Sequence, residues 1–145
     1  MSSATAPHRV SAAPPLVVTL ENTPEAAAVA RDVAGDFLKS LGPPPDRDAS
    51  DAVVLIVSEL VTNAVRHTLT RTCTLSLAAG PHTVTVAVAD ASPRPPCERN
   101  PDVRGEGGGF GWPMVRRLAA STSVETFPQG KTVSAVVARR SKRSG

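Results

Sequence analysis

The sequence is poor in the residues that mark several protein classes. Among its 145 residues are two cysteines, Cys73 and Cys97, which form no CxxC motif and have no pair of histidines nearby. This argues against a disulfide scaffold and against a zinc site, so we expect two free thiols. Aromatic residues make up 3% of the chain, so Val, Leu and Ala have to form the core.

Long apolar runs and targeting signals are also missing. No apolar run approaches the roughly 20 residues of a membrane-spanning helix. The N-terminal MSSATAPHRVSAAPPL lacks the basic stretch followed by an apolar stretch that marks a secretory signal. We therefore expect a cytoplasmic protein with no membrane partner. Residues 1–14 are small and polar with prolines, and we expect them to be disordered.

Much of the basic charge lies at the C-terminal end. The formal net charge is +3, and without four basic residues among the last seven it would be −1. The body of the chain is therefore close to neutral, which argues against direct binding of nucleic acid. We expect residues 139–145 to form a solvated basic tail. Its basic residues are Arg139, Arg140, Lys142 and Arg143.

Branched residues and turn signals predict the first elements. The segment LVVTLE (16–21) is typical of a strand. Thr23 is predicted to cap a helix that has Pro24 at its first position and an acidic residue in its first turn. A glycine and three prolines are predicted to end this helix after Leu41.

A second helix, predicted to begin within 46–50 and to reach Thr68, has two unlike sides. At 100° per residue, seven apolar residues share one arc, which we expect to pack against the body. Polar residues spaced i, i+4, i+8 are predicted to fall on the opposite side. The apolar set is Val53, Val54, Val57, Leu60, Val61, Ala64 and Val65, and the polar set is Glu59, Asn63 and His67, with Thr62 and Arg66.

Alternating residues after Thr70 predict strands. Two such runs are joined by a turn at Gly80-Pro81, and the long loop that follows is typical of functional lids or of disorder. The order of elements predicts an α/β (α+β) two-layer sandwich with helices on one face of a mostly antiparallel sheet. The predicted elements are strands at 72–80 and 82–90, a loop at 91–108, a helix at 111–121, and strands at 124–127 and 131–140.

Three features suggest chemistry, and each has a plainer explanation. Asn63 is a poor residue for the middle of a helix, and its carbonyl oxygen suits a magnesium ion that carries phosphate; with Glu59 it also fits a solvated face. Asp90, at a strand end, is a turn former or an acceptor for an exocyclic amine such as that of adenine. The glycine-rich segment 105–111 allows close approach to an anion before a helix, or forms a lid without chemistry.

Two common nucleotide-binding motifs do not fit these residues. The dinucleotide pattern GxGxxG fails because Phe110 and Trp112 stand where the third glycine is needed. A Walker A loop fails because Glu125 stands where its first glycine should be, although Gly130-Lys131-Thr132 has the right ending.

Four segments in order resemble the N, G1, G2 and G3 boxes of the GHKL (Bergerat-fold) ATPases. They are SELVTNAVRH (58–67), VADASPRP (88–95), GFGW (109–112) before a helix, and GKTV (130–133). The resemblance covers residues 15–138, the predicted ATP-binding domain, and is strongest to the small bacterial anti-sigma-factor serine/threonine kinases. It implies a Bergerat-type fold and binding of ATP with Mg²⁺.

The same resemblance implies roles for single residues. Asn63 would contact magnesium and phosphate, Glu59 would polarise the attacking nucleophile, and Asp90 would bind the adenine amine. The chain departs from the family in G1, where DASPR replaces DxGxG, and in G2, where a tryptophan replaces the usual leucine. The other implied contacts are Arg66 and His67 on the basic flank of the N box, Gly109, Phe110, Gly111 and Trp112 in the lid, and Thr132 beside the adenine.

Two functions fit this resemblance. In the first, the protein transfers the γ-phosphate of ATP to a serine or threonine of an anti-anti-sigma (STAS-type) partner. In the second, nucleotide occupancy controls docking to a sigma factor or another regulator without turnover. A detached histidine-kinase domain is disfavoured because no helical hairpin with a phospho-acceptor histidine is found. Direct DNA binding is disfavoured because no helix-turn-helix is found, and homodimer formation stays open.

Overall fold

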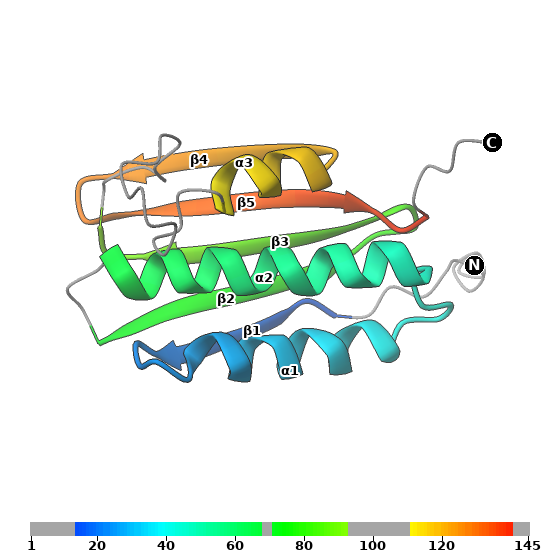
Figure 1. Cartoon of the computed structure of the whole chain (residues 1–145), viewed down its shortest axis with the longest axis horizontal. Helices are drawn as coiled ribbons and strands as arrows, with labels where there is room; N and C mark the ends of the chain where they lie inside the picture. The colour runs from blue at the N-terminus through cyan, green and yellow to red at the C-terminus, as the bar shows by residue number, and fades with distance from the viewer. Residues whose placement is uncertain (1–13, 68–70, 93–110, 141–145) are drawn as a thin grey trace, which may run out of the picture.

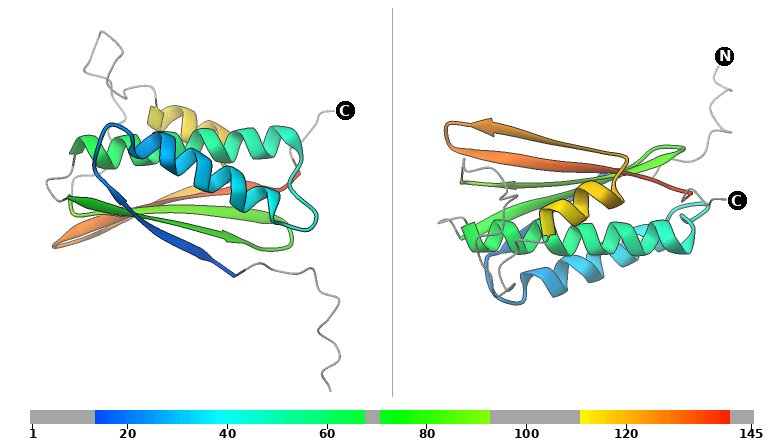
Figure 2. Two further views of the ribbon diagram at one scale, coloured as in Figure 1. Left: turned by 90° about the horizontal axis from the view of Figure 1, so that it is seen from below. Right: turned by 45° about the horizontal axis from the view of Figure 1, so that its top comes forward.

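The computed structural model describes residues 14–67, 71–92 and 111–140. Within these ranges, three helices cover one face of a five-stranded sheet (Figure 1, Figure 2). The strand order is β1-β2-β3-β5-β4, and all neighbouring strands are antiparallel, which confirms the predicted architecture. The elements are β1 (Leu16–Glu21), α1 (Ala26–Lys39), α2 (Arg47–His67), β2 (Thr72–Ala79), β3 (Thr83–Asp90), α3 (Gly111–Leu118), β4 (Ser121–Phe127) and β5 (Gly130–Ala138).

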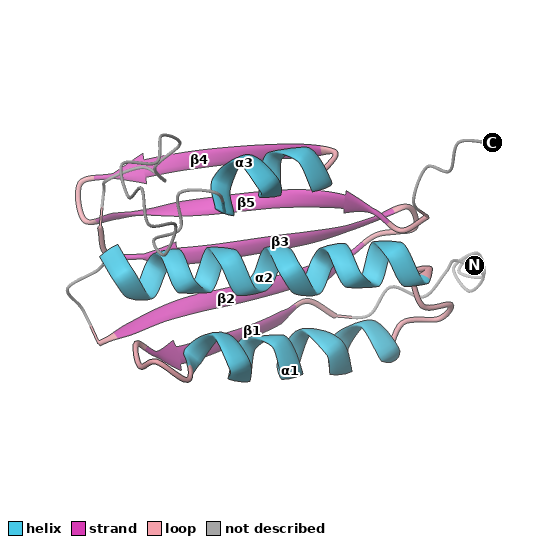
Figure 3. Ribbon diagram, in the orientation of Figure 1, coloured by secondary structure: helices cyan, strands magenta, loops and turns pink. Residues whose placement is uncertain are grey.

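The helices divide the sheet between them. α2 packs on β2, β3 and β5, α1 packs on β1 and β2, and α3 packs on β4 and β5 (Figure 3). Side chains alternate between the two faces of each strand, so Val84, Val86 and Val88 of β3 all face the helices and are buried. Phe37 is the only aromatic side chain among the buried residues of the described ranges. The core is therefore mainly Val, Leu and Ala, as the composition predicts.

α1 is shorter than predicted at both ends. It begins at Ala26, whose N–H donates to the backbone carbonyl of Thr23 at 3.0 Å, so the predicted side-chain cap at Thr23 is wrong. It ends at Lys39, where the Ser40 hydroxyl donates to the Phe37 carbonyl at 2.7 Å. A hydroxyl that binds a carbonyl of the last turn satisfies a group that the helix leaves unpaired.

α2 agrees with its prediction in start and in apolar side. The Asp46 carboxylate accepts the N–H of Ala49 at 2.8 Å, so Asp46 caps the helix. Val53, Val57 and Val61 have no exposed surface. The predicted end, Thr68, lies outside the described residues. None of the helices in the described ranges combines the length and the apolar character that crossing a membrane requires.

Arg139 belongs to the folded body and not to a solvated tail. Its side chain is 7% exposed, and it donates from Nη1 to the Gly80 carbonyl at 2.7 Å and from Nη2 to the Pro43 carbonyl. It therefore ties the β2–β3 turn and the segment between α1 and α2 to the end of β5. Arg140 is exposed, as predicted. The predicted disorder of 1–14 and the rest of the tail concern residues that lie, except for Pro14, outside the described ranges.

Replacing Arg139 with methionine is expected to destabilise the fold. The change leaves two backbone carbonyls without their donor, and hydrogen bonds from a charged group contribute about 1.5–3 kcal/mol to stability. We expect the free energy of unfolding in urea to fall by about that amount. The matched variant Arg140→Met, at an exposed position, should change it by less than about 0.5 kcal/mol. Equal effects of the two variants would contradict the role of Arg139.

Candidate functional site

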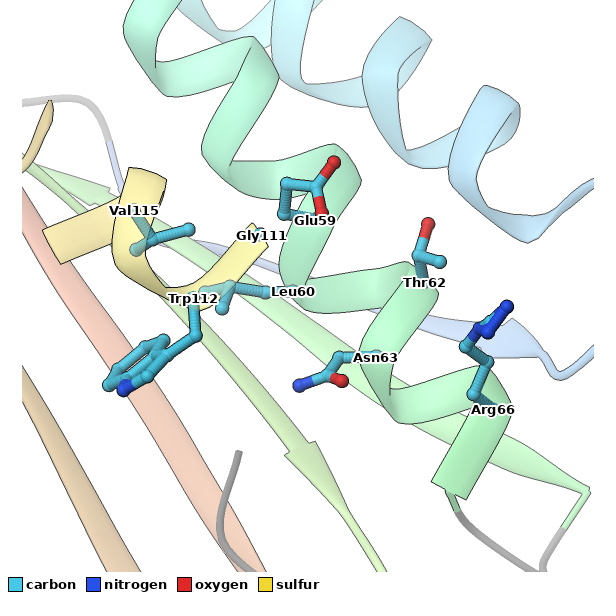
Figure 4. A pocket seen from close by; sticks show the side chains of 8 residues that line it. All are labelled: Glu59, Leu60, Thr62, Asn63, Arg66, Gly111, Trp112 and Val115. Carbon is cyan, nitrogen blue, oxygen red and sulfur yellow. The ribbon is translucent and has the colours of Figure 1, made fainter. Parts of the chain in front are cut away.

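A pocket between α2 and α3 gathers five of the residues to which the sequence points. The two helices that supply them are more than forty residues apart in the chain. The fold places the second half of α2 beside the start of α3 (Figure 1, Figure 4). The pocket is lined by Glu59, Leu60, Thr62, Asn63 and Arg66 of α2 and by Gly111, Trp112 and Val115 of α3. The predicted members of this set are Glu59, Asn63, Arg66, Gly111 and Trp112.

Glu59 and Asn63 lie at the border of the buried side of α2, not opposite to it. Both are half-buried, whereas Arg66 is exposed. The reason is Ile56, which the predicted apolar arc leaves out and which has no exposed surface. Ile56 precedes Asn63 by seven residues, so it lies on the same side of the helix and widens the packed surface. A polar side chain at the border of the buried side can reach a pocket, whereas one on the opposite side of the helix would meet only water.

The carboxylate of Glu59 packs against the first residue of α3. A Cβ added to Gly111 would collide with Glu59 Oε1, so glycine at this position leaves room for the Glu59 carboxylate in the place it occupies (Figure 4). The start of a helix carries partial positive charge, which favours a carboxylate there. Glu59 thus helps to seat α3 in addition to lining the pocket.

A second cluster lies at the end of β3, where Asp90 forms a buried ion pair with Lys131. The two residues are register partners on β3 and β5, and Lys131 Nζ lies 3.1 Å from Asp90 Oδ1 and 3.0 Å from Oδ2. Their side chains are 2% and 3% exposed, respectively. Asp90 Oδ1 also accepts the N–H of Ser92 at 2.8 Å, which is the turn-forming contact of an aspartate. Asp90 is thus a turn former and an ion-pair partner at once.

Sequence reasoning missed Lys131, although a signal for it exists. Lys131 precedes Val133, Ala135 and Val137 at every second position, and those three are buried on the helix-facing side. The same alternation puts Thr132 on the other face, where it pairs with Ala89 and Glu125. The fold therefore brings Lys131, and not Thr132, to Asp90.

Cys73 belongs to this end of the sheet as well. It is a free, buried cysteine on β2, beside the strand that carries Asp90. Burial, and to a lesser degree the negative charge of Asp90, raise the pKa of the Cys73 thiol to about 11. The thiol is therefore protonated near neutral pH and is a poor nucleophile. The expectation of a free thiol is confirmed for Cys73, and Cys97 lies outside the described residues.

Gly130 allows β5 to approach the end of β3 closely. A Cβ there would collide with the carbonyl oxygen of Asp90 and lie 3.0 Å from the Cα of Ala91. Both obstacles are backbone atoms, so a rotamer change cannot remove them.

Replacing Gly130 with alanine is therefore expected to lower the free energy of unfolding by about 1–3 kcal/mol, the usual cost of overpacking. The matched variant is Gly35→Ala in the middle of α1, where an added Cβ meets no atom within 4 Å. That variant should raise stability by about 0.5–1 kcal/mol, because alanine is the better helix residue. Urea unfolding measures both; a Gly130→Ala protein as stable as the wild type would contradict the close approach.

Three predicted site residues cannot be compared with the structure in full. Gly109 and Phe110 lie outside the described ranges. His67 is the last residue of α2, but the description does not extend to its side chain.

Comparisons with known proteins identify a family and a shared fold. A family model described as histidine kinase-like ATPase domain matches residues 20–137. No curated protein matches the chain. Among the matching solved structures is the crystal structure of the RsbU and RsbW domains of Rv1364c from Mycobacterium tuberculosis, with 24% sequence identity and a TM-score of 0.65. That match covers 86% of this chain and 32% of the other, so the chain spans about a third of the length of that protein and shares a fold with it.

Proposed function

The chain belongs to the histidine kinase-like ATPase domain family, and we propose that it is a regulatory protein that binds ATP with Mg²⁺ in the pocket between α2 and α3. The single observation that carries this is the meeting of Glu59, Asn63 and the start of α3 in one pocket. The proposed domain comprises residues 15–139, one residue longer than the sequence predicts, because Arg139 is part of the body.

The residues of the pocket fit a magnesium nucleotide. In the described ranges, no three of the residue types His, Cys, Asp and Glu gather to hold a metal ion by themselves. Mg²⁺ typically takes one or two oxygens from the protein and the rest from phosphate and water, which suits the single amide oxygen of Asn63. When bound, Mg²⁺ would offset the negative charge of the phosphates. Arg66, exposed at the rim, adds a positive charge for the same phosphates.

For the reaction, we propose transfer of the γ-phosphate to a serine or threonine of an anti-anti-sigma (STAS-type) partner. Glu59 accepts the proton of the serine or threonine hydroxyl group while the hydroxyl oxygen forms a bond to the γ-phosphorus. The bond from that phosphorus to the β–γ bridging oxygen breaks, and ADP leaves with the electron pair. The position of Glu59 beside Asn63 supports this assignment.

A second candidate function is a nucleotide-gated docking module for a sigma factor or another regulator. The packing of Glu59 against Gly111 favours this function, because it gives the Glu59 carboxylate a structural role at the start of α3 that does not require transfer of a proton. In this case nucleotide binding alone changes the affinity for the partner.

Calorimetric titration of the purified protein with ATP, with and without Mg²⁺, tests the shared premise. Magnesium-dependent binding with a micromolar dissociation constant, about −8 kcal/mol, is the expected result. A titration that detects no binding at millimolar ATP would overturn both functions.

A further inference from the structure

A second pocket lies at the end of the molecule opposite to the proposed ATP site. Three separate segments form it, namely the link between α1 and α2, the β2–β3 turn and the end of β5 (Figure 1). The N–H of Asp46, just before α2, donates to the Arg139 carbonyl at 3.1 Å, so the pocket adjoins the start of α2. At 1.5 Å per residue, Asn63 lies about 24 Å further along that helix. The pocket has a volume of about 350 Å³ and is lined by Pro43, Pro44, Pro81, His82, Ala138, Arg139 and Arg140.

Arg139 brings to this pocket a positive charge that forms no ion pair with a carboxylate of the described ranges. Its guanidinium group donates to the backbone carbonyls of Gly80 and Pro43, and neither carbonyl carries a net charge. The Asp46 carboxylate accepts the N–H of Ala49 instead. Because the Arg139 side chain is 7% exposed, its charge is largely removed from water, and a buried charge without a counter-charge is costly. An anion in the pocket would supply that counter-charge.

The guanidinium group of Arg139 also has donors left for an anion. A guanidinium group carries five N–H donors. Two of them bind the carbonyls of Gly80 and Pro43, so three have no acceptor among the described residues. The two carbonyls fix the plane of the group, and such a planar fork matches two oxygens of a phosphate or carboxylate group.

Two exposed neighbours add to the charge and to the donors of the pocket. Arg140 contributes a second positive charge, and His82 contributes an imidazole N–H. The backbone N–H of Arg139 donates to the His82 carbonyl at 2.8 Å, which holds the β2–β3 turn against the end of β5. A phosphate monoester carries about −1.5 to −2 charges at pH 7, which the two arginines match.

The size of the pocket favours a small ligand. Sites for small molecules span roughly 300–1,000 Å³, and this pocket lies near the lower limit of that range. Three proline rings form its apolar walls, which suits the short carbon skeleton of a phosphorylated metabolite better than a peptide or a nucleic-acid chain.

We propose that this pocket is a second ligand site, which binds a phosphate group, either free or carried by a small molecule. Arg139 holds two oxygens of the phosphate from the base of the pocket, and Arg140 and His82 bind it from the exposed side. The site is separate from the proposed ATP pocket and does not depend on it.

NMR titration of the ¹⁵N-labelled protein with inorganic phosphate and with glycerol phosphate, at constant ionic strength, tests this inference. We expect saturable shifts of the backbone amide signals of His82, Arg139 and Arg140, with a dissociation constant of about 1 mM or lower. The signals of Asn63 and Gly111 should shift much less. Tighter binding of glycerol phosphate assigns the site to a small organic phosphate, and equal or weaker binding assigns it to free phosphate.

The double variant His82→Ala, Arg140→Met removes the two exposed contacts and leaves Arg139, which also stabilises the fold, in place. Phosphate binding is expected to weaken at least about tenfold, because hydrogen bonds to a charged group are lost. The matched variant Arg71→Met removes an exposed positive charge at the other end of β2, about 26 Å away. It should change the dissociation constant by less than about twofold. Both proteins should melt at the temperature of the wild type.

Several results would overturn the inference. Shifts that grow without saturation, or shifts at Asn63 and Gly111 in place of those at the second pocket, show that phosphate has no site there. An equal loss of affinity in both variants shows an effect of net charge alone. A phosphoserine peptide that binds at least about ten times more tightly than glycerol phosphate makes the ligand a protein segment and overturns the small-molecule assignment. ATP binding is decided separately by the calorimetric titration, so these results leave the proposed function untouched.

Discussion

Replacing Asn63 with alanine is expected to abolish the magnesium-dependent binding of ATP. Among the residues that line the described pocket, Asn63 alone has a side-chain amide, and alanine puts no oxygen in its place. We expect the affinity for Mg²⁺-ATP to fall at least about 100-fold, which corresponds to about 2.8 kcal/mol. Calorimetric titration in the presence and absence of Mg²⁺ measures the loss.

The same substitution separates binding from folding. Asparagine is a poorer helix residue than alanine by a few tenths of a kcal/mol, so Asn63→Ala should keep or slightly raise the stability of α2. Thr62→Ala is the matched control, because Thr62 is its neighbour on α2 and lines the same pocket without an assigned role. Unchanged ATP affinity in Asn63→Ala, or an equal loss in both variants, would remove Asn63 from the site.

The sequence predicts α2 well because one helix carries a strong local signal. Its start within 46–50 and its apolar spacing are both read within about twenty residues, and the structure confirms them. The width of its buried side could not be predicted. Ile56 is buried in the core, and α2 packs against the sheet, α1 and α3, so the width of its buried side depends on the whole fold. The sequence therefore predicts Glu59 and Asn63 on the side of α2 opposite its apolar side, whereas the structure places them at the border of the buried side.

The site at the sheet end shows a different limit. That Asp90 ends a strand is visible in the sequence, but its partner depends on the register between β3 and β5, which are separated by 39 residues. A register shift of one residue exchanges the two faces of a strand. The alternation along β5 places Lys131, and not Thr132, on the buried face, but only the pairing of the two strands shows that Lys131 meets Asp90.

The predicted limit between the domain and the basic tail misplaces Arg139 for a related reason. A cluster of arginines at the end of a chain is usually solvated, and Arg140 follows that rule. Arg139 does not, because two carbonyls from distant turns converge on its guanidinium group. No local pattern encodes that convergence. The start of α1 shows the smaller version of this error, since two turn residues separate Thr23 from the helix.

Replacing Glu59 with glutamine is expected to remove phosphate transfer and to preserve ATP binding. Glutamine has nearly the same shape, so it can still pack against Gly111, but it does not accept a proton from a hydroxyl group. Loss of a general base typically costs about 10²–10⁴-fold in rate. Transfer of labelled phosphate from ATP to purified STAS-type proteins measures the rate, and calorimetric titration should give an ATP affinity within about threefold of the wild type.

Glu125→Gln is the matched control, because Glu125 is an exposed carboxylate on β4, outside the pocket. It should leave both the rate and the affinity unchanged. If the wild-type protein transfers phosphate and Glu59→Gln does so equally fast, Glu59 serves to seat α3 and another group takes the proton. If ATP binds but no STAS-type protein is phosphorylated, the docking module becomes the better account. The carboxylate against Gly111 would then transmit nucleotide occupancy to α3, and Glu59→Gln should change partner affinity instead of a rate.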